Sequence, residues 1–246
     1  MCIDCGCGPT DHHHHDHDHQ APKGKKISIE EDLLAKNNRL ANRNRTLFQQ
    51  QGMLVLNLVS SPGSGKTTIL ETTLTDLKDE LGFAVLEGDQ QTSNDADRIA
   101  ATGVAAHQIN TGAGCHLDAH MVGHGVEHFD LSKTDVLMIE NVGNLVCPAS
   151  FDLGEDAKVA VLSITEGEDK PLKYPQMFRA SKLMLINKLD LLPYLRFDLE
   201  KCREYARRVN PEIEIIELSC YSAEGLEKWY AWLRAQLSAK KYSGKR

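Results

Sequence analysis

The sequence lacks both a long apolar run and an excess of basic residues. No apolar stretch approaches the ~20 residues of a membrane-spanning helix, so we expect no membrane partner. Lys and Arg number 28 against 35 Asp and Glu, which gives a net charge of −7. Nucleic-acid-binding surfaces are normally basic, and we therefore expect no nucleic-acid partner.

The start of the chain also lacks the basic patch and apolar core of a secretory signal, so we expect a cytoplasmic protein. Its seven cysteines are an odd number. In a reducing compartment, cysteines are more often metal ligands or buried thiols than disulfides. The length of 246 residues suits one sizeable α/β domain with extensions.

Composition divides the chain into three parts. Residues 1–27 contain almost nothing that could form a core, so we expect a flexible, Cys- and His-rich metal-binding tail. Residues 28–51 are predicted to form a helix, because Ser28 followed by Glu31 is a capping-box pattern. A leucine stripe with seven-residue spacing runs along it: Leu33, Leu40 and Leu47. The stripe is too short for a coiled coil, and we interpret the segment as a helix packed on its own domain.

The third part, residues 52–246, alternates short apolar runs with helical patterns. Strands buried on both faces of a parallel sheet read as such apolar runs. The predicted strands are 53–59, 83–88, 135–141, 159–164, 183–187 and 213–218, and the predicted helices are 66–81, 93–102, 117–128, 198–209 and 224–238. We therefore expect an α/β fold with a doubly wound, mostly parallel sheet.

The segment LVSSPGSGKTT, residues 58–68, joins a predicted strand to a predicted helix, which is the context of a phosphate-binding P-loop. Glycines there let backbone N–H groups approach phosphate. Lys66 would reach the β- and γ-phosphates, and the Thr67 hydroxyl would bind Mg²⁺. Ser60 replaces the usual first glycine, and a glycine-rich turn with a chance GKT is the alternative. The nucleotide-binding residues expected from this loop are Gly63, Ser64, Gly65, Lys66, Thr67 and Thr68.

Two carboxylates follow later strands. Asp89 lies just past the strand at 83–88, where a loop can reach the metal or the γ-phosphate. Glu140 ends the strand at 135–141 and would bind Mg²⁺ directly or through water, while Gly143 would let its N–H approach the γ-phosphate. We expect Lys66, Asp89 and Glu140 to be catalytic, and Thr67, Asp89 and Glu140 to form the magnesium site. Solvated loop carboxylates are the alternative.

The sequence INKLD, residues 186–190, is the guanine-recognition pattern of GTPases. Guanine presents two adjacent donors that one carboxylate, Asp190, accepts together, whereas adenine has a lone pair there. Lys188 would lie along the base, and Asn187 would tie this loop to the P-loop. Ser219 lies where GTPases place a contact to the guanine oxygen, although Cys220 replaces the usual alanine. GTP and GDP are therefore the expected ligands.

Cys2, Cys5 and Cys7 lie close together at the N-terminus. Three thiolates, with the N-terminal amine as a fourth donor, suit Ni²⁺ in tetragonal geometry or Zn²⁺ in tetrahedral geometry. A tail of redox-active thiols is the alternative. Residues 11–19 hold six histidines interleaved with aspartates, which predicts weak binding of several ions; a cloning tag is the alternative.

A second cluster of candidate metal ligands lies inside the domain. Cys115 and His116 are adjacent, and Cys147 lies four residues beyond Gly143, on the segment expected to sense the γ-phosphate. A site made of these three would link metal occupancy to nucleotide state. His120 and His124 follow at helical spacing as further candidates. Buried thiols and a surface histidine are the alternative.

With these motifs, the whole chain resembles the hydrogenase nickel-incorporation GTPases, the HypB family of SIMIBI-class P-loop GTPases. The resemblance rests on CIDCGCG, NLVSSPGSGKTT, EGDQQT, NTGAGCHLDAHM, IENVGNLVCPASFDLGE, SITEGEDKPLKYPQMF and NKLDLLPYLRFD. It implies a GTP-hydrolysing metallochaperone that passes nickel to the maturing large subunit of [NiFe]-hydrogenase. It also implies a GTP-linked homodimer, a nickel-accessory partner, a nickel site at Cys2, Cys5 and Cys7, and a nickel or zinc site at Cys115, His116 and Cys147.

Two other functions fit these motifs less well. A urease-type nickel-insertion GTPase lacks the N-terminal cysteine motif and the Cys115–His116 pair. A nickel storage protein would not need the intact Lys66, Thr67 and Asp190. We expect slow GTP turnover without a partner, because no arginine of the sequence is identifiable as an inserted finger.

Overall fold

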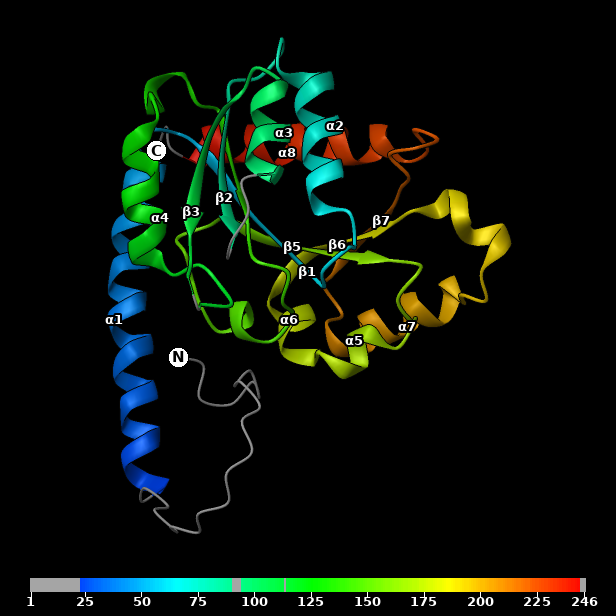
Figure 1. Cartoon of the computed structure of the whole chain (residues 1–246), viewed down its shortest axis with the longest axis horizontal. Helices are drawn as coiled ribbons and strands as arrows, with labels where there is room; N and C mark the ends of the chain where they lie inside the picture. Colours follow the sequence, from blue (N-terminus) through cyan, green and yellow to red (C-terminus); the bar gives the residue numbers. More distant parts are fainter. Residues whose placement is uncertain (1–22, 90–93, 113, 244–246) are drawn as a thin grey trace.

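The computed structural model describes residues 23–89, 94–112 and 114–243. They form a seven-stranded sheet in the order β3-β2-β4-β1-β5-β6-β7, and every neighbouring pair is parallel (Figure 1). The strands are β1 (Leu54–Ser60), β2 (Phe83–Asp89), β3 (Ala105–Asn110), β4 (Val136–Glu140), β5 (Ala157–Ser163), β6 (Ser181–Asn187) and β7 (Glu214–Glu217). The predicted α/β fold with a parallel sheet is confirmed.

Six of these strands match predicted ones, but β3 was not predicted. Its sequence, AAHQIN, is not an apolar run, because β3 is an edge strand whose residues are half-buried or exposed. The helices are α1 (Lys23–Gln50), α2 (Lys66–Leu77), α3 (Asn94–Ala101), α4 (Ala119–Gly125), α5 (Lys170–Lys173), α6 (Pro175–Ala180), α7 (Leu199–Val209) and α8 (Leu226–Ser243).

Alternate residues of β1 face two separate layers of helices. Leu56 and Leu58 belong to a core that includes residues of α2, α3 and α8. Val55 and Val59 belong to cores on the other face, which include residues of α1, α4, α6 and α7. The sheet is therefore covered on both faces, as its apolar strands predict. None of the described helices is long and apolar enough to cross a membrane.

Helix α1 differs from its prediction at its start and in its buried face. It begins at Lys23, so Ser28 lies inside the helix and the predicted capping box is wrong. Lysine is a good helix former, and no proline lies between position 22 and Ser28, so the helix extends past Gly24 to Lys23. Leu33 is 56% exposed. The buried stripe is instead Asn37, Ala41, Asn44 and Phe48.

The predicted helix at 117–128 is shorter than expected. Asp118 caps α4 by accepting a hydrogen bond from the Met121 N–H, so the helix begins at Ala119, and a 3₁₀ turn follows over Val126–His128. Cys115 and His116 therefore lie in the loop before α4. Residues 1–22 of the predicted tail, which contain Cys2, Cys5, Cys7 and the histidine tract, lie outside the described residues, whereas residues 23–27 belong to α1.

Candidate functional site

The P-loop connects β1 to α2 at the carboxyl edge of the sheet. Gly63 and Gly65 have positive φ angles of 74° and 96°. A Cβ atom on Gly65 would lie 2.5 Å from Nδ2 of Asn187, so only glycine fits there. The Lys66 ammonium donates to the Ser60 hydroxyl at 2.8 Å. Ser60, which replaces the usual first glycine, thus contacts the lysine directly.

Two of the residues predicted to hold Mg²⁺ contact each other. The Thr67 hydroxyl donates to Oε1 of Glu140 at 2.7 Å, and both side chains are buried. Oxygen ligands of this kind are those that Mg²⁺ prefers, so the pair fits the ion. Asp89 ends β2, the neighbour of β4 in the sheet, and so lies at the same edge as Glu140. A Cβ on Gly143 would lie 3.1 Å from Pro62, which means that the loop after β4 packs against the P-loop.

The loop after β6 also packs against the P-loop. Nδ2 of Asn187 donates to the Ser64 carbonyl at 3.0 Å, and the Lys188 ammonium donates to the Gly63 carbonyl at 2.7 Å. Ser219 follows β7, the strand beside β6, and its hydroxyl donates to Oδ1 of Asp190. The side chain of Ser219 therefore orients the Asp190 carboxylate, a contact that the sequence analysis missed and that no local pattern indicates.

A second lysine at the P-loop was also missed. Lys170, at the start of α5, donates to the Ser61 hydroxyl at 3.1 Å and forms an ion pair with Glu166 at 3.1 Å. The only sequence signal for it is its place in the motif SITEGEDKPLKYPQMF.

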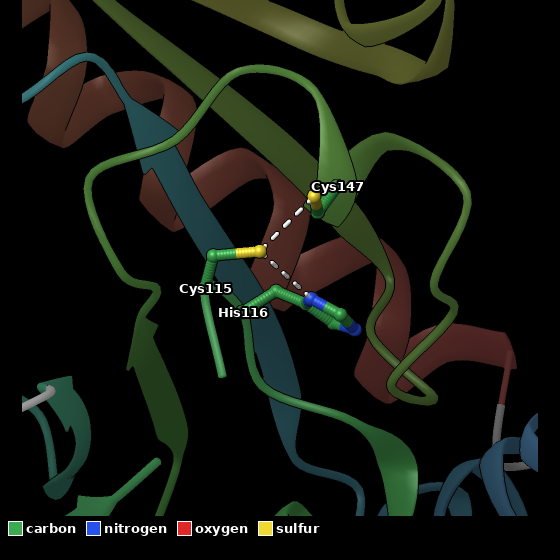
Figure 2. Close-up of side chains that lie close together, drawn as sticks. All are labelled: Cys115, His116 and Cys147. Carbon is green, nitrogen blue, oxygen red and sulfur yellow. Dashed lines mark hydrogen bonds between the residues drawn. The ribbon is translucent and has the colours of Figure 1, made fainter. Parts of the chain in front are cut away.

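Cys115, His116 and Cys147 lie together, with one ligand atom from each within 4.8 Å of the others (Figure 2). The two Sγ atoms are 3.1 Å apart, and Sγ of Cys115 is 3.7 Å from Nδ1 of His116. The imidazole packs against the ring of Phe151 at 4.0 Å between centroids. Burial lowers the pKa of His116, which favours the neutral form that binds metal.

Two thiolates and an imidazole are a donor set for Zn²⁺ or Ni²⁺. His120 and His124 do not belong to this cluster. Their rings contact each other at 4.5 Å between centroids on the exposed face of α4.

Cys202 is buried, which raises its pKa to about 12, and this thiol is a core residue. Burial also raises the pKa of Cys220.

Buried asparagines connect the metal cluster to the nucleotide site, and sequence reasoning missed them as well. Asn141 follows Glu140 directly, and its Oδ1 accepts from the Leu117 N–H at 3.1 Å. Its Nδ2 donates to Asn57 in the middle of β1 at 3.2 Å. Asn57 in turn donates to Glu155 at 3.1 Å. An asparagine within an apolar strand such as MLVLNLV is the one signal that could have indicated this chain of bonds.

Comparison with known proteins gives a consistent result. The family model described as the CobW/HypB/UreG nucleotide-binding domain matches residues 54–217. Hydrogenase maturation factor HypB of Escherichia coli K12 is 63% identical over 215 residues, which cover 87% of this chain and 74% of that protein. The crystal structure of HypB from Helicobacter pylori in complex with nickel is 41% identical with a TM-score of 0.80, and the match covers 84% of this chain and 97% of that one. For HypB from Archaeoglobus fulgidus the identity is 40%, the TM-score 0.78, and the coverage 82% and 99%.

Proposed function

Because the chain belongs to the CobW/HypB/UreG family and, within it, to the HypB hydrogenase maturation factors, we propose that it is a GTP-hydrolysing nickel metallochaperone. It delivers nickel to the maturing large subunit of a [NiFe]-hydrogenase. The observation that carries this proposal is the cluster of Cys115, His116 and Cys147, which lies on the segments next to the nucleotide site.

The nucleotide chemistry follows from the geometry of the loops. Asp190, oriented by Ser219, accepts the paired N–H donors of guanine. Lys66 stabilises the charge on the transferred phosphoryl group, and Glu140 with Thr67 and Asp89 holds Mg²⁺, which neutralises the phosphate oxygens when bound. Gly143 lies against the P-loop, which supports the proposal that its N–H responds to the γ-phosphate. Turnover without a partner is slow.

The metal chemistry follows from the donor set. Nickel is the cargo of the Cys115, His116 and Cys147 site, and zinc can occupy the same ligands. Cys2, Cys5 and Cys7 form a second nickel site in the tail. A GTP-dependent homodimer, a nickel-accessory protein and the hydrogenase large subunit are the proposed partners, and the proposed compartment is the cytoplasm. Light scattering with GDP and with a non-hydrolysable GTP analogue tests the homodimer.

Complementation tests the delivery function. In a strain that lacks its own nickel-insertion GTPase, the wild-type chain should restore hydrogenase activity at low nickel, whereas Cys115→Ser and Cys147→Ser should not. Cys202→Ala is the control, since that thiol is a core residue outside the cluster and the nucleotide site. Restoration of urease activity in place of hydrogenase activity, or full activity of both cluster variants, would overturn the proposal.

A further inference from the structure

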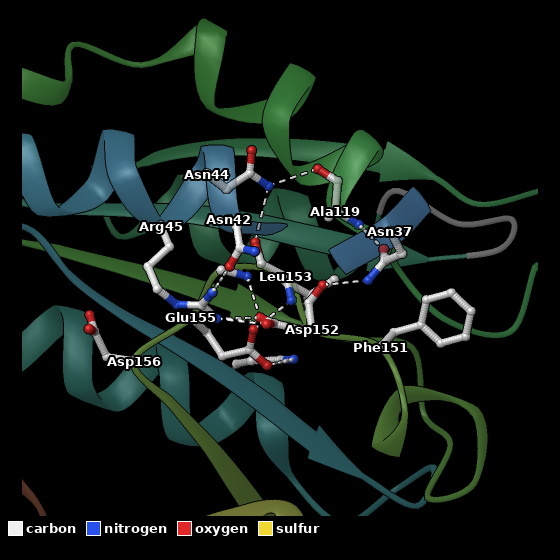
Figure 3. Close-up of polar contacts among 12 residues, drawn as sticks. Asn37, Asn42, Asn44, Arg45, Ala119, Phe151, Asp152, Leu153, Glu155 and Asp156 are labelled. Carbon is white, nitrogen blue, oxygen red and sulfur yellow. Dashed lines mark hydrogen bonds and ion pairs between the residues drawn. The ribbon is translucent and has the colours of Figure 1, made fainter. Parts of the chain in front are cut away.

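Helix α1 makes hydrogen bonds to both segments that carry the metal ligands, at Ala119 and at residues 152–153 (Figure 3). Cys115 and His116 precede α4, and Cys147 precedes the loop that reaches residues 151–155. Where these segments meet α1, the inner face of the helix presents Asn37 and Asn44, two turns apart. Asparagine is mostly an exposed residue, yet these two are 5% and 7% exposed.

We propose that α1 is a positioning element of the internal metal site, which holds the two ligand segments together through Asn37 and Asn44. This inference rests on the proposed function of Cys115, His116 and Cys147 as a metal site. Neither asparagine is a ligand; each acts through the backbone of the segments that carry the ligands.

Asn37 bridges the two segments with the two ends of its amide. Its Oδ1 accepts from the Ala119 N–H at 2.9 Å, three residues beyond His116. Its Nδ2 donates to the Asp152 carbonyl at 2.8 Å, five residues beyond Cys147. The amide has a donor and an acceptor at opposite ends, so it can bond a backbone N–H of one segment and a backbone C=O of the other at once.

Asn44 makes the second bridge. Its Nδ2 carries two hydrogens, and it donates to the Ala119 carbonyl at 2.8 Å and to the Leu153 carbonyl at 3.1 Å. The loop comes so close here that a Cβ on Gly154 would lie 2.7 Å from the Ala41 carbonyl. Gly154 has a φ of 92°, so both its conformation and its space require glycine.

Arg45 is a third residue of α1 that contacts the loop. Its guanidinium makes two hydrogen bonds of 2.7 Å to the Asp152 carboxylate. Burial acts to raise the pKa of Asp152, but the bonds from Arg45 and from the Gly154 N–H outweigh it and the net shift is downward. The carboxylate is therefore ionised and paired with Arg45 near neutral pH, which fixes this loop to the helix.

The shared amides give α1 a role beyond ordinary packing. If each segment were bonded to a different residue of α1, the loss of one bond would loosen one segment only. Here the loss of one amide removes a bond to both segments and lets Cys147 move relative to Cys115 and His116. A ligand set that is assembled for only part of the time binds metal more weakly in proportion to that fraction.

The distance between the two thiols can be tested without metal. Full-length protein with Cys2, Cys5 and Cys7 replaced by alanine is equilibrated with reduced and oxidised glutathione. Two electrons pass from the Cys115 and Cys147 thiols to oxidised glutathione, which yields one protein disulfide and two reduced glutathione molecules. The equilibrium constant, measured by mass spectrometry of the linked peptides, reports the effective concentration of one thiol at the other.

Asn37→Ala and Asn44→Ala should each lower this effective concentration about tenfold, because each removes two hydrogen bonds made by a buried residue. Asn37→Asp keeps the acceptor for Ala119 but sets a carboxylate oxygen against the Asp152 carbonyl, so a loss at least as large as that of Asn37→Ala is expected. Asn38→Ala is the matched control, since Asn38 is the exposed neighbour on the same helix. GDP affinity should stay unchanged in all four variants, which separates loss of positioning from general unfolding.

Nickel titration of the same variants, followed by the sulfur-to-nickel charge-transfer absorption, should show the same order of loss. If Cys115→Ala leaves nickel binding unchanged, the proposed metal site is wrong, yet the thiol equilibrium still decides the role of α1. If Asn37→Ala and Asn44→Ala retain the thiol equilibrium of the Asn38→Ala control, α1 does not position the segments. Should Asn44→Ala fail to fold, Asn37→Asp with unchanged GDP affinity gives the same decision.

Discussion

Replacement of Asn141 by leucine should uncouple the metal cluster from the nucleotide site. Asn141 lies between Glu140 and the loop that contains Gly143, and its Oδ1 holds the N–H of Leu117, the residue after His116. If the γ-phosphate moves that loop, as we propose, the hydrogen bond from Leu117 to Asn141 should transmit the shift to the segment of Cys115 and His116. Leucine has a similar volume and cannot make the bond.

The expected magnitude comes from the contacts. The substitution leaves the Leu117 N–H and the Asn57 side-chain oxygen, both buried, without this partner, and each loss costs about 1–3 kcal/mol of stability. Allosteric coupling energies are typically about 1–3 kcal/mol, or roughly 5–150-fold in affinity. One buried hydrogen bond contributes about 0.5–1.5 kcal/mol net, so a single bond of this kind can carry much of the coupling.

The assay is a thermodynamic cycle on protein with Cys2, Cys5 and Cys7 replaced by alanine. Nickel affinity is measured with GDP and with a non-hydrolysable GTP analogue, and the affinities for both nucleotides are measured with and without nickel. Linkage requires that the nucleotide changes the nickel affinity by the same factor by which nickel changes the nucleotide affinity. We expect a factor well above one in the parent protein and a factor near one in Asn141→Leu.

Asn210→Ala is the control for destabilisation alone. Asn210 donates to the Phe178 and Ser181 carbonyls, at the amino end of β6 and away from both sites. It should lower stability and leave the coupling factor unchanged. Equal nickel affinities in the two nucleotide states of the parent protein would mean that Cys147 is a passive ligand, and the cause of nickel release would then lie in the partner. Full coupling in Asn141→Leu would refute the role of Asn141.

Three further outcomes are expected. Asp190→Asn should keep its bond from Ser219 and turn an amide N–H₂ toward the base. Competition binding should then show that the preference moves from GTP to XTP by up to about 10⁴-fold. An unchanged preference would contradict guanine recognition. Lys66→Ala should lower turnover at least ~10²-fold with an unaltered circular dichroism spectrum, and rapid turnover of the wild type alone would contradict the expected partner dependence. Lys158→Met removes the cation that lies 2.6 Å from the buried Glu155 carboxylate, and it should lower the free energy of unfolding in urea by about 3–5 kcal/mol. Glu155→Gln in the same chain should recover part of this loss. A loss below ~1 kcal/mol would disprove the argument.

The parallel sheet could be predicted because its inner strands are apolar on both faces. β3 was not predicted because an edge strand is less buried and does not require apolar residues. His107 and Gln108 interrupt its apolar run. The leucine stripe was predicted as the inner face of α1 because buried helix faces are usually apolar. That face packs partly on loops, whose backbone N–H and C=O groups need polar partners, so Asn37 and Asn44 are buried there and Leu33 is not.

The nucleotide motifs could be predicted from local sequence, because each P-loop or guanine-recognition residue acts within a few positions of its neighbours. The contacts between motifs could not. Ser219 meets Asp190, and Lys170 meets Ser61, only because the carboxyl ends of parallel strands converge at one edge of the sheet. Sequence spacing does predict which segment follows which strand. It does not predict which side chain of that segment turns toward its neighbour.

The three ligands of the internal metal cluster are consistent with delivery. Structural zinc sites are closed by four protein ligands, whereas sites that exchange a ligand keep a position open. Within the described part of the chain, the cluster joins three ligands, all half-buried, and two of them come from a loop different from that of the third. We expect a thiolate or imidazole of a recipient to add a fourth ligand to these three before the first bond breaks. Because Cys147 lies four residues beyond Gly143, the proposed response of this loop to the γ-phosphate would shift one ligand out of three, which would weaken the site without dismantling it.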